Sequence, residues 1–214
     1  MSLNIPQHYR CALMSLPEAF ETSLDSIPPP APLWVPGILP GQVANMIEAG
    51  KNRFRVGIVW SGNPAFHDNR RRAARLECFL PLAEAPGVQL YSLQKGEAER
   101  ELADSGAQGL VPALGPYLED FADTAAVIRQ LDLIIMTDSG VAHLAGALGR
   151  PVWNLLPFNA YWLYLTQRAD SPWYSSMRLF RQPRAGDWES VFKTVRSELA
   201  AAVELKRSGR WHAG

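Results

Sequence analysis

The sequence predicts an α/β fold with a Rossmann-like, doubly wound parallel sheet, and three observations support this prediction. Short apolar segments of strand length alternate along the chain with segments of helical spacing. The strand-like segments are mainly apolar, which is typical of parallel strands covered by helices on both faces. The chain has 214 residues, of which 47% are apolar and 20% charged, and this is enough for one sizeable core.

Five segments are predicted as the main strands. The first, residues 54–60, is rich in β-branched and aromatic residues and ends at a Ser-Gly-Asn-Pro turn. The others are residues 88–93, 133–136, 151–155 and 177–180, and a further short strand is expected at residues 109–111.

Segments of helical spacing lie between these strands. A helix over residues 76–85 is expected to end at a Pro-Gly pair. Either Asp123 or Thr124 is predicted to cap a helix that ends at residue 131, and Asp187 to cap a closing helix that ends near residue 205. Two further helices are predicted at residues 97–105 and 139–148.

Proline content sets the predicted domain organisation. Eight of the 17 prolines lie in the first 40 residues, and proline both fixes φ and lacks a backbone N–H. We therefore expect residues 1–53 to form a leader and a semi-rigid proline-rich linker, with a short helix ending at Gly50. A Rossmann-like domain is placed at residues 54–205, and residues 206–214 are expected to form a basic tail.

Composition excludes several classes of protein. Lys plus Arg (21) balances Asp plus Glu (21), which disfavours a dedicated nucleic-acid binder. Two cysteines, Cys11 and Cys78, cannot build a disulfide framework, and no Cys or His spacing indicates a metal site. We find no apolar run of membrane-spanning length and no signal peptide, so a cytoplasmic location is predicted.

The strongest candidate site follows the strand at residues 133–136. Asp138 can cap the next helix, and Ser139 and Gly140 occupy its first turn, where unpaired N–H groups and the helix dipole favour an anion. His143, in the second turn, could reach a phosphate or a sugar hydroxyl. The alternative is structural: Asp138 is only a cap and His143 is a partly buried histidine.

Two other strand ends carry polar, glycine-containing turns. Lys95 and a glycine follow the strand at residues 88–93, although such a lysine is often merely solvated. The turn after residue 60 offers backbone donors and is followed by Arg70, Arg71 and Arg72, which could clamp an anion. A run of arginines also occurs on solvated faces and on RNA-binding surfaces. We expect these turns to meet at one edge of the parallel sheet, because ligands bind beyond the carboxyl ends of the strands in such sheets.

Several motifs in order resemble the C-terminal, donor-binding half of GT-B glycosyltransferases. The likeness is strongest to the heptosyltransferase-like family nine domain of bacterial tetratricopeptide-repeat proteins, and it covers nearly the whole chain. The motifs are VGIVWSGNP (56–64), YSLQKG (91–96), DFADTAAVI (120–128), LDLIIMTDSGVAHLAGALGRPVW (131–153) and DSPWYSSMRLFRQP (170–183).

The resemblance implies one half of a GT-B architecture that binds a nucleotide-diphosphate sugar as donor substrate, with no metal and no cofactor. It implies that the backbone amides of Ser139, Gly140 and Val141 contact the pyrophosphate and that Asp138 and His143 shape the sugar-phosphate pocket. It also implies that Gln94 and Lys95 contact the nucleotide and that Ser61, Gly62 and Asn63 face the cleft.

The resemblance leaves the general base and the acceptor unassigned, because in the resembled enzymes both come mainly from an N-terminal domain. We therefore expect metal-independent, inverting transfer of a hexose or heptose together with an acceptor domain or a tetratricopeptide-repeat partner. One alternative is a non-catalytic nucleotide-sugar-binding or interaction module. A third hypothesis is RNA binding through residues 70–72 and the basic tail.

Overall fold

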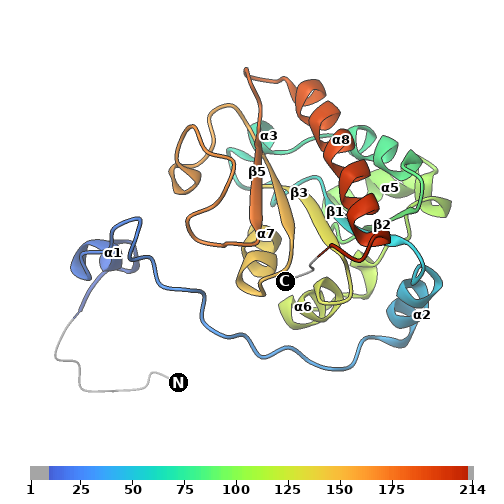
Figure 1. Ribbon diagram of the computed structural model, residues 1–214, viewed down its shortest axis with the longest axis horizontal. Helices are drawn as coiled ribbons and strands as arrows, with labels where there is room; N and C mark the ends of the chain where they lie inside the picture. The colour runs from blue at the N-terminus through green and yellow to red at the C-terminus, as the bar shows by residue number, and fades with distance from the viewer. Residues whose placement is uncertain (1–9, 212–214) are drawn as a thin grey trace.

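A computed structural model describes residues 10–211, and its centre is a sheet of five parallel strands in the order β2-β1-β3-β4-β5 (Figure 1). The doubly wound parallel sheet predicted from the sequence is confirmed. All five main strands lie close to their predicted positions. Their bounds are β1 Phe54–Val59, β2 Val88–Ser92, β3 Leu133–Thr137, β4 Val152–Leu156 and β5 Met177–Arg181.

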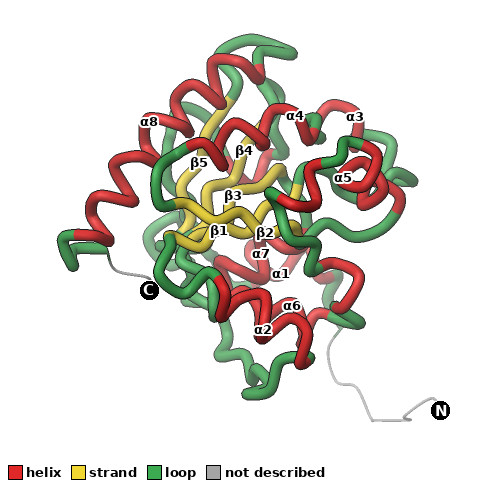
Figure 2. The backbone as a smooth tube through the Cα atoms, turned by 90° about the vertical axis from the view of Figure 1, so that its right-hand side faces the viewer, coloured by secondary structure: helices red, strands yellow, loops and turns green. Residues whose placement is uncertain are grey.

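Helices cover both faces of the sheet, and Figure 2 shows the sheet nearly edge-on between them. Because side chains alternate between the faces of a strand, the apolar strands supply two cores: Ile58 belongs to one and Val59 to the other. The first face is covered by α4 (Leu76–Phe79), α5 (Arg100–Asp104) and α8 (Trp188–Arg207). The second is covered by α2 (Gly41–Ala49), α6 (Phe121–Ile128) and α7 (Gly140–Ala147).

Two predicted helices are shorter than expected. Helix α4 stops at Phe79 and continues as a 3-10 segment over Leu80–Glu84, because Pro81 lacks the N–H that an α-helix would use there. The helix predicted at residues 97–105 likewise begins as a 3-10 turn before α5.

Two local expectations are wrong. The short strand expected at residues 109–111 is absent among the described residues: a 3-10 turn occupies Ala107–Gly109, and a single bridge joins Ser92 to Ala113. The cap of α6 is Asp120, three residues before the first predicted candidate. Its carboxylate accepts the N–H groups of residues 122 and 123, so the helix begins one turn earlier than its apolar spacing indicated.

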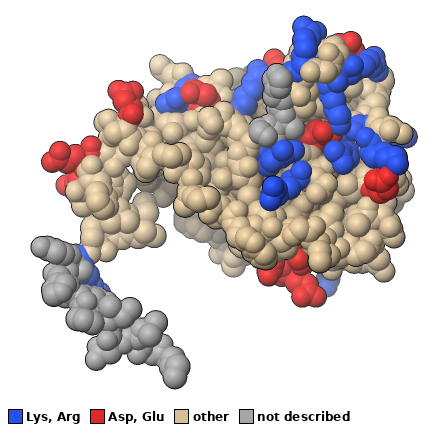
Figure 3. All heavy atoms as spheres, turned by 60° about the horizontal axis from the view of Figure 1, so that its bottom comes forward, with Lys and Arg blue, Asp and Glu red and all other residues tan. Residues whose placement is uncertain are grey.

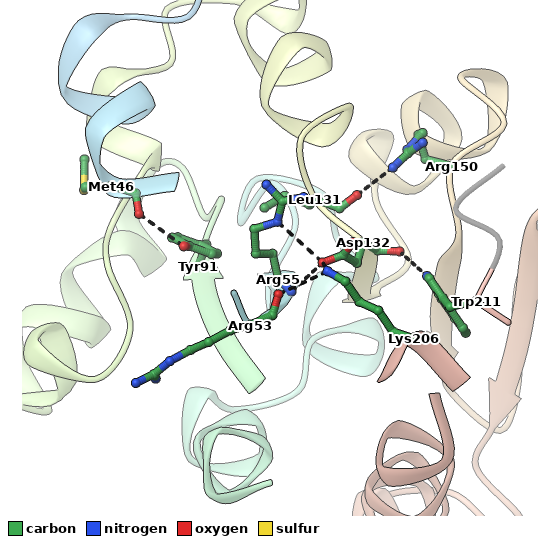
Figure 4. A network of polar contacts seen from close by, with 9 residues as sticks. All are labelled: Met46, Arg53, Arg55, Tyr91, Leu131, Asp132, Arg150, Lys206 and Trp211. Carbon is green, nitrogen blue, oxygen red and sulfur yellow. Dashed lines mark hydrogen bonds and ion pairs between the residues drawn. The ribbon is translucent and has the colours of Figure 1, made fainter. Parts of the chain in front are cut away.

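A group of polar contacts at the N-terminal edge of the sheet joins the start of β3 to the end of α8 (Figure 4). Asp132, directly before β3, accepts the backbone N–H of Arg55 at 2.8 Å and the ammonium of Lys206 at 2.6 Å. Trp211 donates its indole N–H to the Asp132 carbonyl and packs its ring edge-on against Phe54. The described part of the predicted basic tail, up to residue 211, is therefore attached to the sheet.

The N-terminal part of the described chain forms an arm that extends away from the body (Figure 1). It contains α1 (Leu16–Ala19), which buries no side chain, and its first firm contact is Val35, which packs near α6 and α7. In Figure 3 the arm carries acidic side chains, while basic ones gather on the body. Helix α2, within the predicted leader, buries Val43 and Ile47 in the core of the second face.

Within residues 10–211, no helix combines the length and the apolar character needed to cross a membrane.

Candidate functional site

A cavity of about 540 Å³ lies at the carboxyl edge of the sheet, where β1, β2 and β3 end. Strand order changes direction between β1 and β3, and open α/β sheets bind ligands at such a switch point. Eight of the ten predicted binding residues line this cavity. They are Ser61, Gly62, Asn63, Gln94, Lys95, Ser139, Gly140 and Val141.

The start of α7 forms one wall of the cavity. Ser139 is the residue before the helix, with extended backbone and no capping hydrogen bond from its side chain. The first N–H groups of a helix have no acceptor within that helix, and the helix dipole places partial positive charge there. Gly140 is exposed, and a Cβ placed on it would lie 3.5 Å from the ring of Phe121. The wall therefore presents backbone donors that a ligand can approach closely.

The helix α7 lies close to its neighbours because its inner residues are small. Ala142 and Ala145 are fully buried in the core of the second face. A Cβ on Gly146 would come within 2.5 Å of the ring of Tyr174, which packs against the helix at this position. The small residues thus place the helix N-terminus directly behind the end of β3.

The opposite wall is the turn after β1, and two amide side chains hold it in place. Gln94 is 2% exposed; its Oε1 accepts the backbone N–H groups of Trp60 and Ser61, and its Nε2 donates to the carbonyls of Ser61 and Lys95. Asn69 accepts the Gly62 N–H at 3.0 Å and donates to the Ser61 hydroxyl. Gln94 was expected to contact the nucleotide, but its side-chain oxygen and nitrogen are both hydrogen-bonded to backbone groups that hold the ends of β1 and β2 together.

Lys95 lies at the cavity rim with its side chain directed along the loop before α6. Its ammonium donates to the carbonyl of Gly115 at 3.1 Å and also to that of Leu118. Gly115 packs so closely on the Gln94 carbonyl that any Cβ there would collide with it. The lysine places a positive charge at the cavity while it fixes the loop that forms the cavity's third side.

Asp138 and His143 lie behind the cavity wall instead of lining it. Asp138 is 4% exposed and accepts hydrogen bonds from the Tyr164 hydroxyl at 2.6 Å and from the Arg72 guanidinium at 3.2 Å. It does not cap α7: Ser139 is the residue before the helix, and the Asp138 carboxylate accepts from Tyr164 and Arg72 instead of from a helix N–H. The purely structural alternative of a helix cap is therefore wrong for this residue.

His143 sits between two tyrosine hydroxyls. The Tyr164 hydroxyl donates its only proton to Asp138. It can therefore only accept a hydrogen bond from His143 Nε2, which lies 3.4 Å from the hydroxyl oxygen. This arrangement places the histidine proton on Nε2 and leaves Nδ1 to accept from the Tyr174 hydroxyl at 3.3 Å. Burial lowers the pKa of His143, although Asp138 opposes that effect, so the neutral ring is favoured. Burial also raises the pKa of Tyr164 and keeps it a donor.

Sequence reasoning missed the third side of the cavity and the residues that support it. The loop before α6 and the start of that helix contribute Glu119, Asp120, Phe121 and Thr124. A signal for them existed in the sequence, because Asp120 precedes an apolar helix in the way a cap does. Asn69 and Tyr164 gave no comparable signal, since their contacts span 7 and 26 residues of sequence. Arg72 was predicted as a possible anion clamp, but it pairs with Asp138, 66 residues away.

Part of the chain matches a known family. Residues 84–155 match the sequence model of Glycosyltransferase family 9 (heptosyltransferase), and this segment runs from β2 through β4 and contains the start of α7. Protein FlbA of Caulobacter vibrioides is 28% identical over 149 residues, which are 68% of this chain and 25% of FlbA. The chain thus spans a quarter of the length of this curated relative.

Solved heptosyltransferases share the fold. The E. coli ADP-heptose lps heptosyltransferase II superimposes with a TM-score of 0.55 at 16% identity, covering 83% of this chain and 56% of that one. E. coli heptosyltransferase WaaC, solved with ADP, gives 0.51 at 18% identity, covering 76% of this chain and 46% of WaaC. The chain therefore has the α/β fold of about half of a heptosyltransferase, as predicted for one half of a GT-B architecture, and residues 84–155 carry the glycosyltransferase family 9 match.

Proposed function

We propose that the cavity at the carboxyl edge of the sheet binds a nucleotide-diphosphate sugar and that the chain takes part in glycosyl transfer. The observation that carries this proposal is the exposed N-terminus of α7, opening through Gly140 onto a cavity at the switch point of the sheet. A volume of about 540 Å³ lies in the range of sites for ligands of nucleotide size. The family match includes this helix start.

In the proposed reaction, an acceptor hydroxyl oxygen attacks the anomeric carbon of the donor sugar. The bond from that carbon to the diphosphate oxygen breaks, and its electron pair leaves with the diphosphate. The amides of residues 139–141 and the ammonium of Lys95 stabilise the growing negative charge. The hydroxyl proton passes to a general base of the acceptor-binding part. We infer that an acceptor domain or a tetratricopeptide-repeat partner supplies this part and that the protein works in the cytoplasm.

A non-catalytic binding module is the second candidate, and one observation favours it. The carboxylates among the described cavity-lining residues, which are the groups that could serve as a general base, are Glu119 and Asp120. Asp120 is occupied as the cap of α6. The buried Asp138 is occupied by Tyr164 and Arg72. Turnover of a labelled nucleotide sugar by the chain together with a candidate acceptor part distinguishes an enzyme from a module.

Titration calorimetry with ADP, UDP and their sugars tests donor binding. Gly140→Ala is the sharpest variant, because its new methyl group meets only ordinary contact with Phe121 in the protein and yet stands where a phosphate would approach the helix. We expect at least tenfold weaker diphosphate binding with an unchanged thermal midpoint. Gly41→Ala, at the start of α2 and with nothing within 4 Å of its Cβ, is the matched control. Failure of every nucleotide to bind the native chain at millimolar concentration would overturn the proposal.

Lys95→Ala provides an independent check of the assigned contact. The loss of its ammonium should weaken binding of a nucleoside diphosphate more than binding of the corresponding nucleoside. Lys193→Ala, on the exposed side of α8, should change neither affinity. Equal losses for diphosphate and nucleoside in the Lys95 variant would contradict the contact.

A further inference from the structure

A second cavity, of about 420 Å³, lies on the same edge of the sheet beyond the ends of β4 and β5. The loop after β4 contributes residues 157–159, and the segment between β5 and α8 contributes Gln182, residues 185–186 and Trp188. The third side is α3 (Asn69–Arg72), which contributes Arg70 and Arg71. This cavity shares no lining residue with the candidate donor cavity.

The short helix α3 stands between the two cavities. Residues three apart share a helix face, so Asn69 and Arg72 point together toward the donor side. There Asn69 bonds to Gly62, and Arg72 pairs with Asp138. The two residues between them, Arg70 and Arg71, project from the other faces into the second cavity. The arginine run is thus divided: one member is bound in the wall of the first site and two face the second.

The charges around the second cavity favour an anion. Its nine lining residues include two arginines and no acidic residue. Arg70 has no carboxylate within 4 Å among the described residues, and Arg71 reaches Asp68 only at 3.9 Å with 77% of its side chain exposed. Guanidinium groups bind phosphate and carboxylate through charge-assisted hydrogen bonds.

The remaining lining residues suit a carbohydrate. Phe158 is 48% exposed and Trp188 half-buried, so both offer aromatic surface on which a sugar ring can pack. Gln182 is 3% exposed, and its Oε1 accepts the N–H groups of Phe158 and Gly186, which fixes both loops that form the cavity. Asn159 adds an amide that can bond to hydroxyl groups.

We propose that this second cavity is a subsite for an anionic sugar on the acceptor side, with Arg70 and Arg71 holding its phosphate or carboxylate and Phe158 packing on its ring. The role on the acceptor side rests on the proposed donor function, whereas the binding of an anionic sugar does not. The position supports the role, because α3 lines this cavity with Arg70 and Arg71 and bonds to the wall of the donor site through Asn69 and Arg72.

Titration of the chain with glucose 6-phosphate, glucuronate and glucose tests the proposal. Native protein should bind at least one of the two anionic sugars and bind glucose at least tenfold more weakly. The double variant Arg70→Gln/Arg71→Gln should lose at least tenfold in affinity for the anionic sugar. Which of the two anions binds tells whether the site takes a phosphate or a carboxylate.

Two control variants separate this site from surface charge and from the donor cavity. Arg75→Gln removes an arginine whose side chain is 84% exposed and does not line the cavity, and it should leave affinity within twofold of native. Lys95→Gln should weaken ADP or UDP binding but not binding of the anionic sugar. The proposal would be overturned if glucose bound as tightly as the anionic sugars or if the double variant kept the native affinity. It would also be overturned if Lys95→Gln weakened binding of the anionic sugar as much as the double variant does. The absence of binding by both anionic sugars at about 10 millimolar, which is about ten times the dissociation constant of a 1 mM site, would overturn it as well.

Discussion

Removal of the hydrogen bonds of Gln94, without a change in its volume, should destabilise the whole carboxyl edge of the sheet. Gln94→Met keeps a side chain of similar length but leaves four backbone groups without their partner: two N–H groups after β1 and two carbonyls. Each buried group left unpaired costs about 1–3 kcal/mol. The Trp60 N–H is buried, whereas Ser61 is half-buried and can regain water. We therefore expect the free energy of unfolding to fall by about 2–4 kcal/mol.

Urea denaturation followed by circular dichroism measures this loss, with an unchanged m-value as the sign that the native state keeps its compactness. Gln130→Ala, an exposed glutamine two residues after α6, should change stability by less than about 0.5 kcal/mol. Nucleotide affinity should also fall, because the turn at residues 61–63 loses its support. A loss of stability no larger than that of the control would show that the Gln94 hydrogen bonds do not hold the two strand ends together.

Three further predictions follow from the contacts behind the cavity and from the arm. Tyr164→Phe removes one of the two donors to Asp138 and should lower the free energy of unfolding by about 1.5–3 kcal/mol in urea denaturation, with a loss within error as the contradicting result. The pKa of His143 is lowered in the folded state, so the unfolded chain binds the proton first as pH falls below about 6.5, and the free energy of unfolding decreases there. His143→Gln should flatten this part of the curve of stability against pH. Identical curves for the native chain and the variant would refute the assignment. Deletion of residues 10–30 should leave the thermal midpoint nearly unchanged, since α1 buries no side chain, and a clear drop would reveal contacts made by the arm.

The positions of the five strands could be predicted because each is mainly apolar, and β1, β3 and β4 are buried almost throughout. The cavity followed from the same pattern, since the chain must turn with polar and glycine residues wherever a buried parallel strand ends. Ser139, Gly140 and the turn at residues 61–63 were found in this way. No regular pattern marks the loop over residues 113–119, and its contribution to the cavity could not be predicted from spacing.

Which residues at the strand ends stay exposed to a ligand and which are buried in the cavity wall could not be read from the sequence. Gln94, Lys95 and Asp138 all follow strand ends, so spacing alone treats them as equivalent. Gln94 and Asp138 are nevertheless buried, and their polar atoms are occupied by groups from distant segments, while Lys95 remains exposed. A buried polar side chain must satisfy its hydrogen bonds inside the protein, and only the arrangement of the loops decides which partners it meets. Variants of Gln94 and Asp138 should therefore reduce stability and ligand affinity together, whereas Gly140→Ala should reduce ligand affinity alone.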